Sequence, residues 1–176
     1  AQSQKDWSGG AESYMLFLVV ADHNSESALI ADRLSENLCK MADYQAIDGI
    51  TIYLKKIIEP KTKNHLVIEG AGGVLVPLNN EDCIIDLIQK DYKVIIVSRH
   101  YLGSINHTLL TFEALKSRKI EVAGILFSGD ENKASEEIIL SKTKTKFIGR
   151  IDNEPYFDQN VIQYYADKFR DSLLTL

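Results

Sequence analysis

The sequence of 176 residues has only two cysteines, no excess of basic residues and no long apolar run, and each lack excludes a class of protein. Cys39 and Cys83 stand far apart and form no metal-ligand spacing, so we expect them to be thiols in a reducing compartment. The four histidines form no HxxxH or HExxH pattern, which leaves zinc hydrolysis without support. A formal net charge of −5 argues against a nucleic-acid partner, because phosphate binding needs a basic surface.

A membrane partner is not expected either. The longest apolar run, Met15–Ala21, is much shorter than the ~20 residues that a membrane-spanning helix needs. Asp6, Glu12 and Asp22 lie where a signal peptide would have a basic start and an apolar stretch. The sequence therefore predicts a cytoplasmic protein. Its length fits one domain over residues 1–176, with residues 1–12 as a polar, frayed end.

Short apolar runs alternate with segments of helical periodicity. The runs that read as buried parallel strands are Met15–Ala21, His65–Glu69, Lys93–Ser98, Val122–Phe127 and Lys146–Ile151. The segments that read as helices are Ser27–Met41, Asp82–Ile88, Asn106–Arg118, Ser135–Ser141 and Gln159–Leu174. In the third of these helices, Leu109, Phe112 and Leu115 are spaced to face inward.

This alternation predicts an α/β fold of three layers, a mostly parallel sheet with helices on both faces. Ligands of such folds gather beyond the carboxyl ends of the strands, where loops meet the first turns of helices. The loops after Ala21, Glu69, Ser98 and Phe127 are therefore the places to search for a site.

The loop after the second apolar run reads Glu69-Gly70-Ala71-Gly72-Gly73. A carboxylate at the tip of a buried strand suits a magnesium ion. The small residues that follow allow backbone amides to approach a polyanion with no side chain in the way. A tight turn with a solvated glutamate explains the same residues, and their chemistry alone does not separate the two.

The loop after the third run, Gly103-Ser104-Ile105-Asn106, opens a helix, and Ser104 is the expected N-cap. The free amides and the positive dipole end of that helix would attract an anion. A plain capped helix is the alternative.

The segment Leu66-Val67-Ile68-Glu69-Gly70-Ala71-Gly72-Gly73-Val74-Leu75-Val76-Pro77 resembles the signature loop of the dethiobiotin synthetases. The resemblance continues through the segments 94–98, 102–110 and 122–125, and it covers roughly residues 47–176. It implies a fold of the P-loop NTPase type. It also implies an ATP-dependent ligase of biotin biosynthesis, which closes 7,8-diaminopelargonic acid and CO2 into dethiobiotin with release of ADP and phosphate.

The resemblance further implies roles for individual residues. Glu69 would be the catalytic residue that ligates Mg²⁺, and Gly70, Ala71, Gly72 and Gly73 would border ATP and the substrate. Gly103, Ser104 and Ile105 would hold the carboxylate of the diamino acid. Asn106 would reach across the interface of a homodimer into the partner's site.

The chain departs from the family pattern at several positions. Ser128 stands where relatives carry an asparagine that reads adenine, and it remains the candidate for that contact. The expected Gly-x-x-x-x-Gly-Lys-Thr loop is not recognisable, since the connection 21–28 contains neither glycine nor lysine. A Lys-Pro substrate motif is also missing, and residues 13–46 diverge from the family. The alternative to an enzyme is therefore a degenerate, non-catalytic member that acts as a dimeric binding protein.

Overall fold

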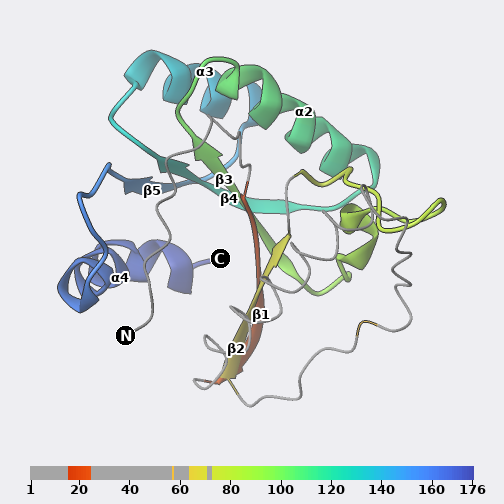
Figure 1. Cartoon of the computed structure of the whole chain (residues 1–176), viewed down its shortest axis with the longest axis horizontal. Coiled ribbons are helices and arrows are strands. Elements are labelled where there is room, and N and C mark those ends of the chain that lie inside the picture. The colour runs from red at the N-terminus through yellow and green to blue at the C-terminus, as the bar shows by residue number, and fades with distance from the viewer. Residues whose placement is uncertain (1–15, 25–56, 58–63, 71–72) are drawn as a thin grey trace, which may run out of the picture.

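The computed structural model describes residues 16–24, 57, 64–70 and 73–176 (Figure 1). The elements are β1 (Leu16–Asn24), β2 (Asn64–Gly70), the 3-10 helix η2 (Ile84–Leu87), β3 (Lys93–Arg99), α2 (Ser104–Ser117), β4 (Val122–Ser128), α3 (Lys133–Thr143), β5 (Phe147–Ile151) and α4 (Gln159–Leu174). The predicted frayed end 1–12, the helix Ser27–Met41, the connection 25–28, Ala71 and Gly72 lie outside the described residues.

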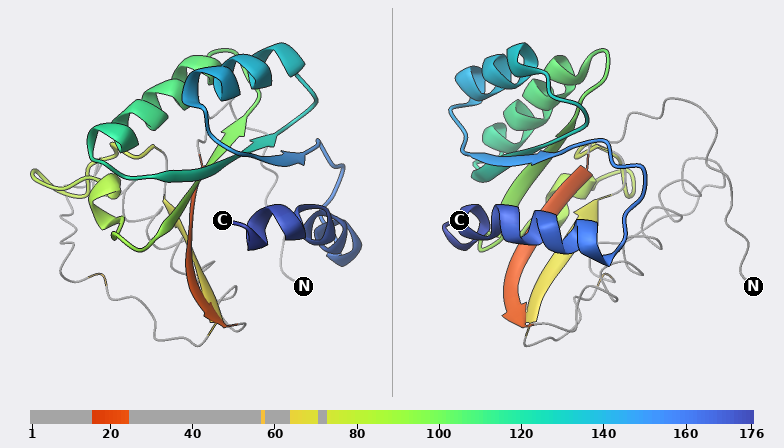
Figure 2. Two further views of the ribbon diagram at one scale, coloured as in Figure 1. Left: turned by 180° about the vertical axis from the view of Figure 1, so that it is seen from behind. Right: turned by 90° about the vertical axis from the view of Figure 1, so that its left-hand side faces the viewer.

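The five strands form one sheet in the order β2-β1-β3-β4-β5. Strands β3, β4 and β5 pair in parallel, whereas β1 is antiparallel to both β2 and β3. Strand β2 therefore runs in the same direction as β3, and the prediction of a mostly parallel sheet is confirmed. Figure 2 shows β1 beside β2 at one side of the sheet.

The prediction that Met15–Ala21 forms a parallel strand is wrong in direction, because β1 runs against its neighbours. An apolar run has the same pattern in either direction, so its composition carries no information about strand polarity. Strand β1 also continues to Asn24, through residues that the sequence assigned to a loop.

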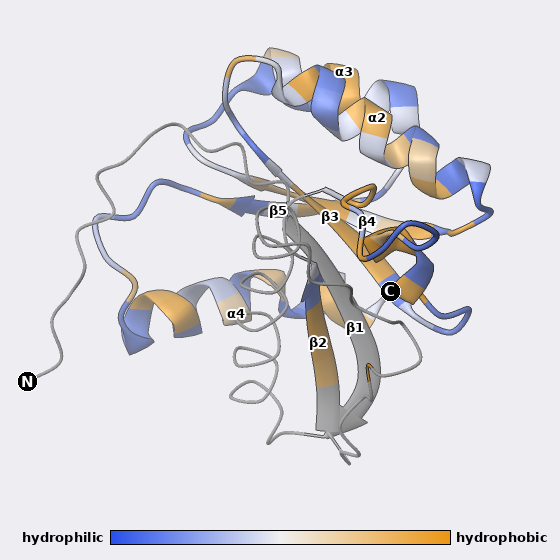
Figure 3. Cartoon of the chain, turned by 45° about the vertical axis from the view of Figure 1, so that its right-hand side comes forward, coloured by the Kyte–Doolittle hydropathy of each residue, from blue (hydrophilic) through white to orange (hydrophobic). Residues whose placement is uncertain are grey.

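Helices cover both faces of the sheet, as predicted (Figure 1). Successive residues of β3 alternate between the two cores, since side chains of a strand point to opposite faces. Val94 and Ile96 belong to the cluster that also contains Leu115 of α2 and Ile139 of α3. Ile95 packs instead with residues of β5 and α4. Figure 3 shows the hydrophobic colouring concentrated on β3 and β4, between these helices.

The inward face of α2 is only partly the predicted one. Leu115 is fully buried, but Leu109 and Phe112 are half-buried. The other buried positions of α2 are hydroxyl residues, namely Ser104, Thr108 and Thr111. Such small side chains let the helix approach β3 closely, and periodicity of apolar residues does not reveal them. None of the described helices is long and apolar enough to span a membrane.

Gly149 of β5 leaves room for the ring of Phe169 of α4 against the sheet. A Cβ atom at this position would lie 2.2 Å from Cε1 of Phe169, which is itself buried. We expect Gly149→Val to lower the free energy of unfolding by about 1–3 kcal/mol, because the ring has no room to move away. Urea denaturation would measure the loss. The double variant with Phe169→Leu should recover part of it, and additive losses would contradict this explanation.

Candidate functional site

The predicted site residues come together at the carboxyl edge of the sheet. Glu69 and Gly70 end β2, Gly103 follows β3, and Ser128 ends β4. Since these three strands run in the same direction, their ends lie at one edge. A cavity of about 300 Å³ lies between the loop after β2 and α2, lined among others by Gly73, Leu75, Tyr101, His107 and Leu110. Of the predicted site residues that the structure describes, Gly73 alone lines it.

The segment that follows the glycine loop is held firmly by backbone hydrogen bonds. The amide of Val76 donates to the carbonyl of Gly73 at 3.0 Å, and the amide of Ile85 donates to the carbonyl of Val74 at 2.8 Å. Val74 is buried in the core beside β3. A Cβ atom on Gly73 would meet nothing within 4 Å. Packing against the described residues therefore does not require glycine here.

Glu69 is the carboxylate nearest to this loop in sequence, and it is half-buried at the end of β2. Within the described ranges, no three His, Cys, Asp or Glu side chains gather closely enough to hold a metal ion by themselves. Magnesium is commonly held by one or two carboxylates, with nucleotide phosphates and water completing its shell. A lone glutamate at this position therefore fits a magnesium ion that arrives with a nucleotide.

The start of α2 differs from the prediction. Gly103, not Ser104, is the N-cap, with a φ of 101°, and no side chain caps the first turn. Glycine adopts this left-handed conformation without the steric cost that serine would have. Ser104 is instead the first helical residue and is buried. The amide of Ser104 donates to the carbonyl of Tyr101 at 3.1 Å. The amides of Ile105 and Asn106, which no side chain caps, are the ones that could receive an anion.

A chain of buried hydroxyls joins the first turn of α2 to β3. Thr108 Oγ1 donates to the carbonyl oxygen of Ser104 at 2.7 Å, and it lies 2.7 Å from Ser98 Oγ. Because Thr108 has a single hydroxyl proton, Ser98 must donate in the second bond. All three residues are buried. These two hydrogen bonds of Thr108, the Thr108 clamp, set the position of the first turn of α2 relative to the sheet.

We expect Thr108→Val to lower the free energy of unfolding by about 1–3 kcal/mol, because the isosteric change leaves Ser98 Oγ buried without a partner. Chemical denaturation would measure the change. Ser117→Ala on the same helix is the control, since its exposed hydroxyl donates to Ala114 at 2.8 Å and its removal should cost little. Equal losses for the two variants would contradict the clamp.

Ile105 and Asn106 lie on the exposed side of α2. Leu102 beside them is fully exposed, and Leu110 and Leu75 are each more than half exposed. That Asn106 reaches a second protomer stays a prediction.

Ser128 is half-buried, and its carbonyl accepts the amide of His100 at 2.8 Å. The next residue, Gly129, has a φ of 109°, and its amide donates to the carbonyl of Ile151 at 2.9 Å. The turn after β4 therefore lies between the ends of β3 and β5. Whether Ser128 contacts adenine stays a prediction.

Sequence reasoning missed a charged network at the same edge. His100 Nε2 lies 2.9 Å from Glu136 Oε1, and Arg150 NH1 donates to both oxygens of Glu136, at 2.9 and 3.2 Å. Arg150 Nε also donates to Asp152 at 2.9 Å. The guanidinium of Arg150 is therefore paired with acidic side chains. Nothing in the periodicity of α3 marks Glu136 as buried, so the network had no signal in the sequence.

The network fixes the charges of its members. Burial raises the pKa of the Glu136 carboxyl, but the hydrogen bonds from His100 and Arg150 together outweigh it, and the net pKa is lowered. The hydrogen bond to Asp152 is the main reason that the pKa of Arg150 is raised. Glu136 is therefore a carboxylate, and Arg150 a cation, throughout the physiological range.

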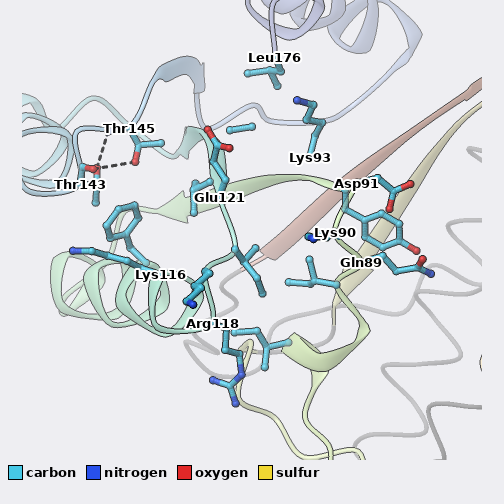
Figure 4. Close-up of a pocket in the computed structure, with 18 of the residues that line it drawn as sticks. Gln89, Lys90, Asp91, Lys93, Lys116, Arg118, Glu121, Thr143, Thr145 and Leu176 are labelled. Atoms are coloured by element: carbon cyan, nitrogen blue, oxygen red, sulfur yellow. Dashed lines mark hydrogen bonds between the residues drawn. The ribbon is translucent and has the colours of Figure 1, made fainter.

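A larger cavity, of about 1390 Å³, lies at the opposite, amino edge of the sheet (Figure 4). Its lining is rich in cations, and it contains no predicted site residue. Helices α2, α3 and α4 all end beside it, and Lys146 Nζ donates to the carbonyl of Ser172 at 2.8 Å near the end of α4. Cations at helix carboxyl ends stabilise the helices, which accounts for much of this charge.

Comparison with known proteins identifies a family for the chain. The sequence matches the profile of the AAA domain family over residues 18–161. An ATP-dependent dethiobiotin synthetase from Christiangramia forsetii is 58% identical over 127 residues, covering 72% of this chain and 61% of the relative. Another from Cytophaga hutchinsonii is 50% identical over 127 residues, covering 71% and 62%.

A third relative with the same description, from Rhodopseudomonas palustris, is 40% identical over 118 residues, covering 66% of this chain and 56% of its own length. The chain spans about three fifths of the length of the first two relatives. Together with the α/β fold, these matches decide the family. The chain belongs to the AAA domain family, and its resemblance to the dethiobiotin synthetases is confirmed.

Proposed function

We propose that the chain takes part in the dethiobiotin synthetase reaction, the ATP- and Mg²⁺-dependent closure of 7,8-diaminopelargonic acid and CO2 into dethiobiotin, with release of ADP and phosphate. One observation carries the proposal. The glycine loop after Glu69 and the start of α2, the two segments with the strongest resemblance to the family, lie at the same edge of the sheet, and Gly73 shares a cavity with His107 and Leu110 of α2. The relatives' printed name, ATP-dependent dethiobiotin synthetase, supports the same reaction.

Each segment has a distinct task in this proposal. The turn from Gly103 to Ile105 binds the substrate carboxylate through the amides of Ile105 and Asn106, because no side chain caps these amides and the helix dipole favours an anion. The backbone from Gly70 to Gly73 borders the nucleotide and the substrate. Glu69 would hold the magnesium ion. Bound ATP supplies the phosphoryl group that activates the carboxylated diamine for ring closure.

We also propose that residues 1–176 form one domain that works as a cytoplasmic homodimer. Asn106 and the apolar side chains of Leu102, Ile105 and Leu110 are exposed together near the start of α2. Exposed apolar groups that cluster beside a site favour an interface. In the dimer, Asn106 would contribute to the site of the second protomer.

A second candidate function is a non-catalytic one, and the direction of β1 favours it. Leu16 pairs with Val97 and Val20 pairs with Lys93, so β1 ends at the amino edge of the sheet. A loop that follows β1 therefore starts at the edge opposite Glu69. Such a chain would keep the substrate half of the site and act as a dimeric binding protein.

Calorimetry with Mg²⁺–ATP separates the two candidates. For the enzyme we expect saturable binding and formation of dethiobiotin, with both the Mg²⁺ dependence and the turnover reduced in Glu69→Gln. Glu81→Gln, which changes an exposed glutamate in the loop after β2, is the matched control. Binding of the diamino acid without any binding of Mg²⁺–ATP would contradict the enzymatic proposal and support the non-catalytic one.

A further inference from the structure

His100 is the first residue after β3, and it anchors the path into α2. Its ring is 10% exposed, although Leu102 two residues later projects fully into solvent. The ring stacks on Phe127 of β4, with 5.5 Å between centroids and 9° between planes. Its backbone amide donates to the carbonyl of Ser128. The connection between β3 and the turn Gly103–Asn106, the substrate turn, is therefore held at its first residue.

The side-chain hydrogen bond of His100 has a defined direction. Glu136 is a carboxylate that accepts from Arg150, so it has no proton to donate to the imidazole. His100 must therefore carry a proton on Nε2 and donate it to Glu136 Oε1, 2.9 Å away. Glu136 is buried in the first turn of α3. The bond thus ties the end of β3 to α3 and, through Arg150, to β5.

The other ring nitrogen shows that packing alone does not explain this histidine. His100 Nδ1 is buried and has no hydrogen-bond partner among the described residues. A buried polar atom without a partner is destabilising, and such atoms are rare in native structures. A phenylalanine would stack on Phe127 without that cost. What histidine provides here and phenylalanine does not is therefore the hydrogen bond from Nε2 to Glu136.

We propose that His100 is a positioning residue for the substrate turn. The inference rests on the proposed function, because it concerns the carboxylate site at the start of α2. His100 fixes where the chain leaves β3, and the Thr108 clamp fixes where α2 begins. Between these two anchors, Gly103 takes its left-handed conformation and presents the first-turn amides. Loss of the Nε2 bond leaves this anchor held by the stacking on Phe127 and the backbone bond to Ser128, so the anchor loosens and those amides shift.

The test compares the affinities of 7,8-diaminopelargonic acid and its methyl ester by calorimetry, without ATP. The ester lacks the carboxylate charge, so the ratio of the two dissociation constants isolates the carboxylate contact. We expect His100→Phe, which keeps the stacking, to reduce the wild-type preference for the acid by about tenfold, because preorganisation is lost. His100→Gln, which can still donate to Glu136, should retain most of the preference.

A control variant and a second measurement keep the result interpretable. Tyr165→Phe removes a buried hydroxyl that lies 2.6 Å from Glu154 on the other face of the sheet, and it should leave the ratio unchanged. Hydrogen exchange of the His107 amide, which donates to the carbonyl of Gly103 at 3.0 Å, should be faster in His100→Phe than in the wild type.

An unchanged ratio in a folded His100→Phe variant overturns the inference, and so does unchanged exchange at His107. If the wild type binds acid and ester equally, the proposed substrate site is wrong, and the exchange experiment alone then decides whether His100 positions the turn. Failure of the proposed function and failure of the inference are therefore distinguishable.

Discussion

Replacing Glu136 by alanine is expected to lower the free energy of unfolding by about 2–4 kcal/mol, because two partly buried donors lose the same charged acceptor. The variant removes one acceptor of the Arg150 guanidinium, which is 19% exposed, and leaves its bond to Asp152 in place. It also removes the acceptor of His100. Urea denaturation at neutral pH, followed by circular dichroism, measures the change. Glu137→Ala is the matched control, because that neighbouring glutamate is exposed.

The same carboxylate predicts the acid sensitivity of the protein. Its pKa is lower in the folded state than in the unfolded chain, so its contribution to stability is present above the unfolded pKa, near 4.5. That contribution is lost as the pH falls through the lower folded value. The gap in stability between the wild type and Glu136→Ala should therefore narrow between neutral pH and pH ~3. A gap that is equal at both pH values would show that Glu136 acts through packing and not through charge.

Replacing Phe127 by alanine is expected to cost a similar amount, about 3–5 kcal/mol, because it opens a cavity in the core. The ring of Phe127 is fully buried in the cluster beneath α2 and α3. It also supports the stacked ring of His100, so the start of the substrate turn should loosen together with the core. Thermal and urea denaturation measure the first effect, and hydrogen exchange near Gly103 measures the second.

Phe157→Ala serves as the control for this variant. Its ring is 59% exposed, so its loss should change stability by no more than about 0.5 kcal/mol. A large loss in stability of Phe127→Ala without faster exchange near Gly103 would separate the core role of Phe127 from its support of His100.

The sequence was most informative where periodicity and strand composition were clear. Helix α4 begins and ends at the predicted residues, and β3 and β4 each extend one residue beyond the prediction. The convergence of Glu69 and Gly103 at one edge also followed from the expected parallel sheet. These features depend on local patterns of apolar residues and on the general geometry of α/β folds.

Other features depend on three-dimensional contacts that no local pattern encodes. The polarity of β1 is set by the path of the chain and not by its apolar residues. The N-cap at Gly103 was missed because serine is the commoner cap and the left-handed turn had no separate signal. The network of His100, Glu136 and Arg150 joins residues 36 and 14 positions apart, so only the folded sheet brings them together.

The polarity of β1 also limits how a triphosphate can be held at this site. Leu18 pairs with Glu69, and Asn24 lies six positions later, roughly 20 Å further along the strand. A phosphate-binding loop placed after Asn24 would thus be separated from Glu69 by most of the depth of the sheet. The end of β1 that reaches the carboxyl edge is its beginning, Leu16. The first amides after Asn24 therefore start too far from Glu69 to meet a phosphate bound beside that carboxylate.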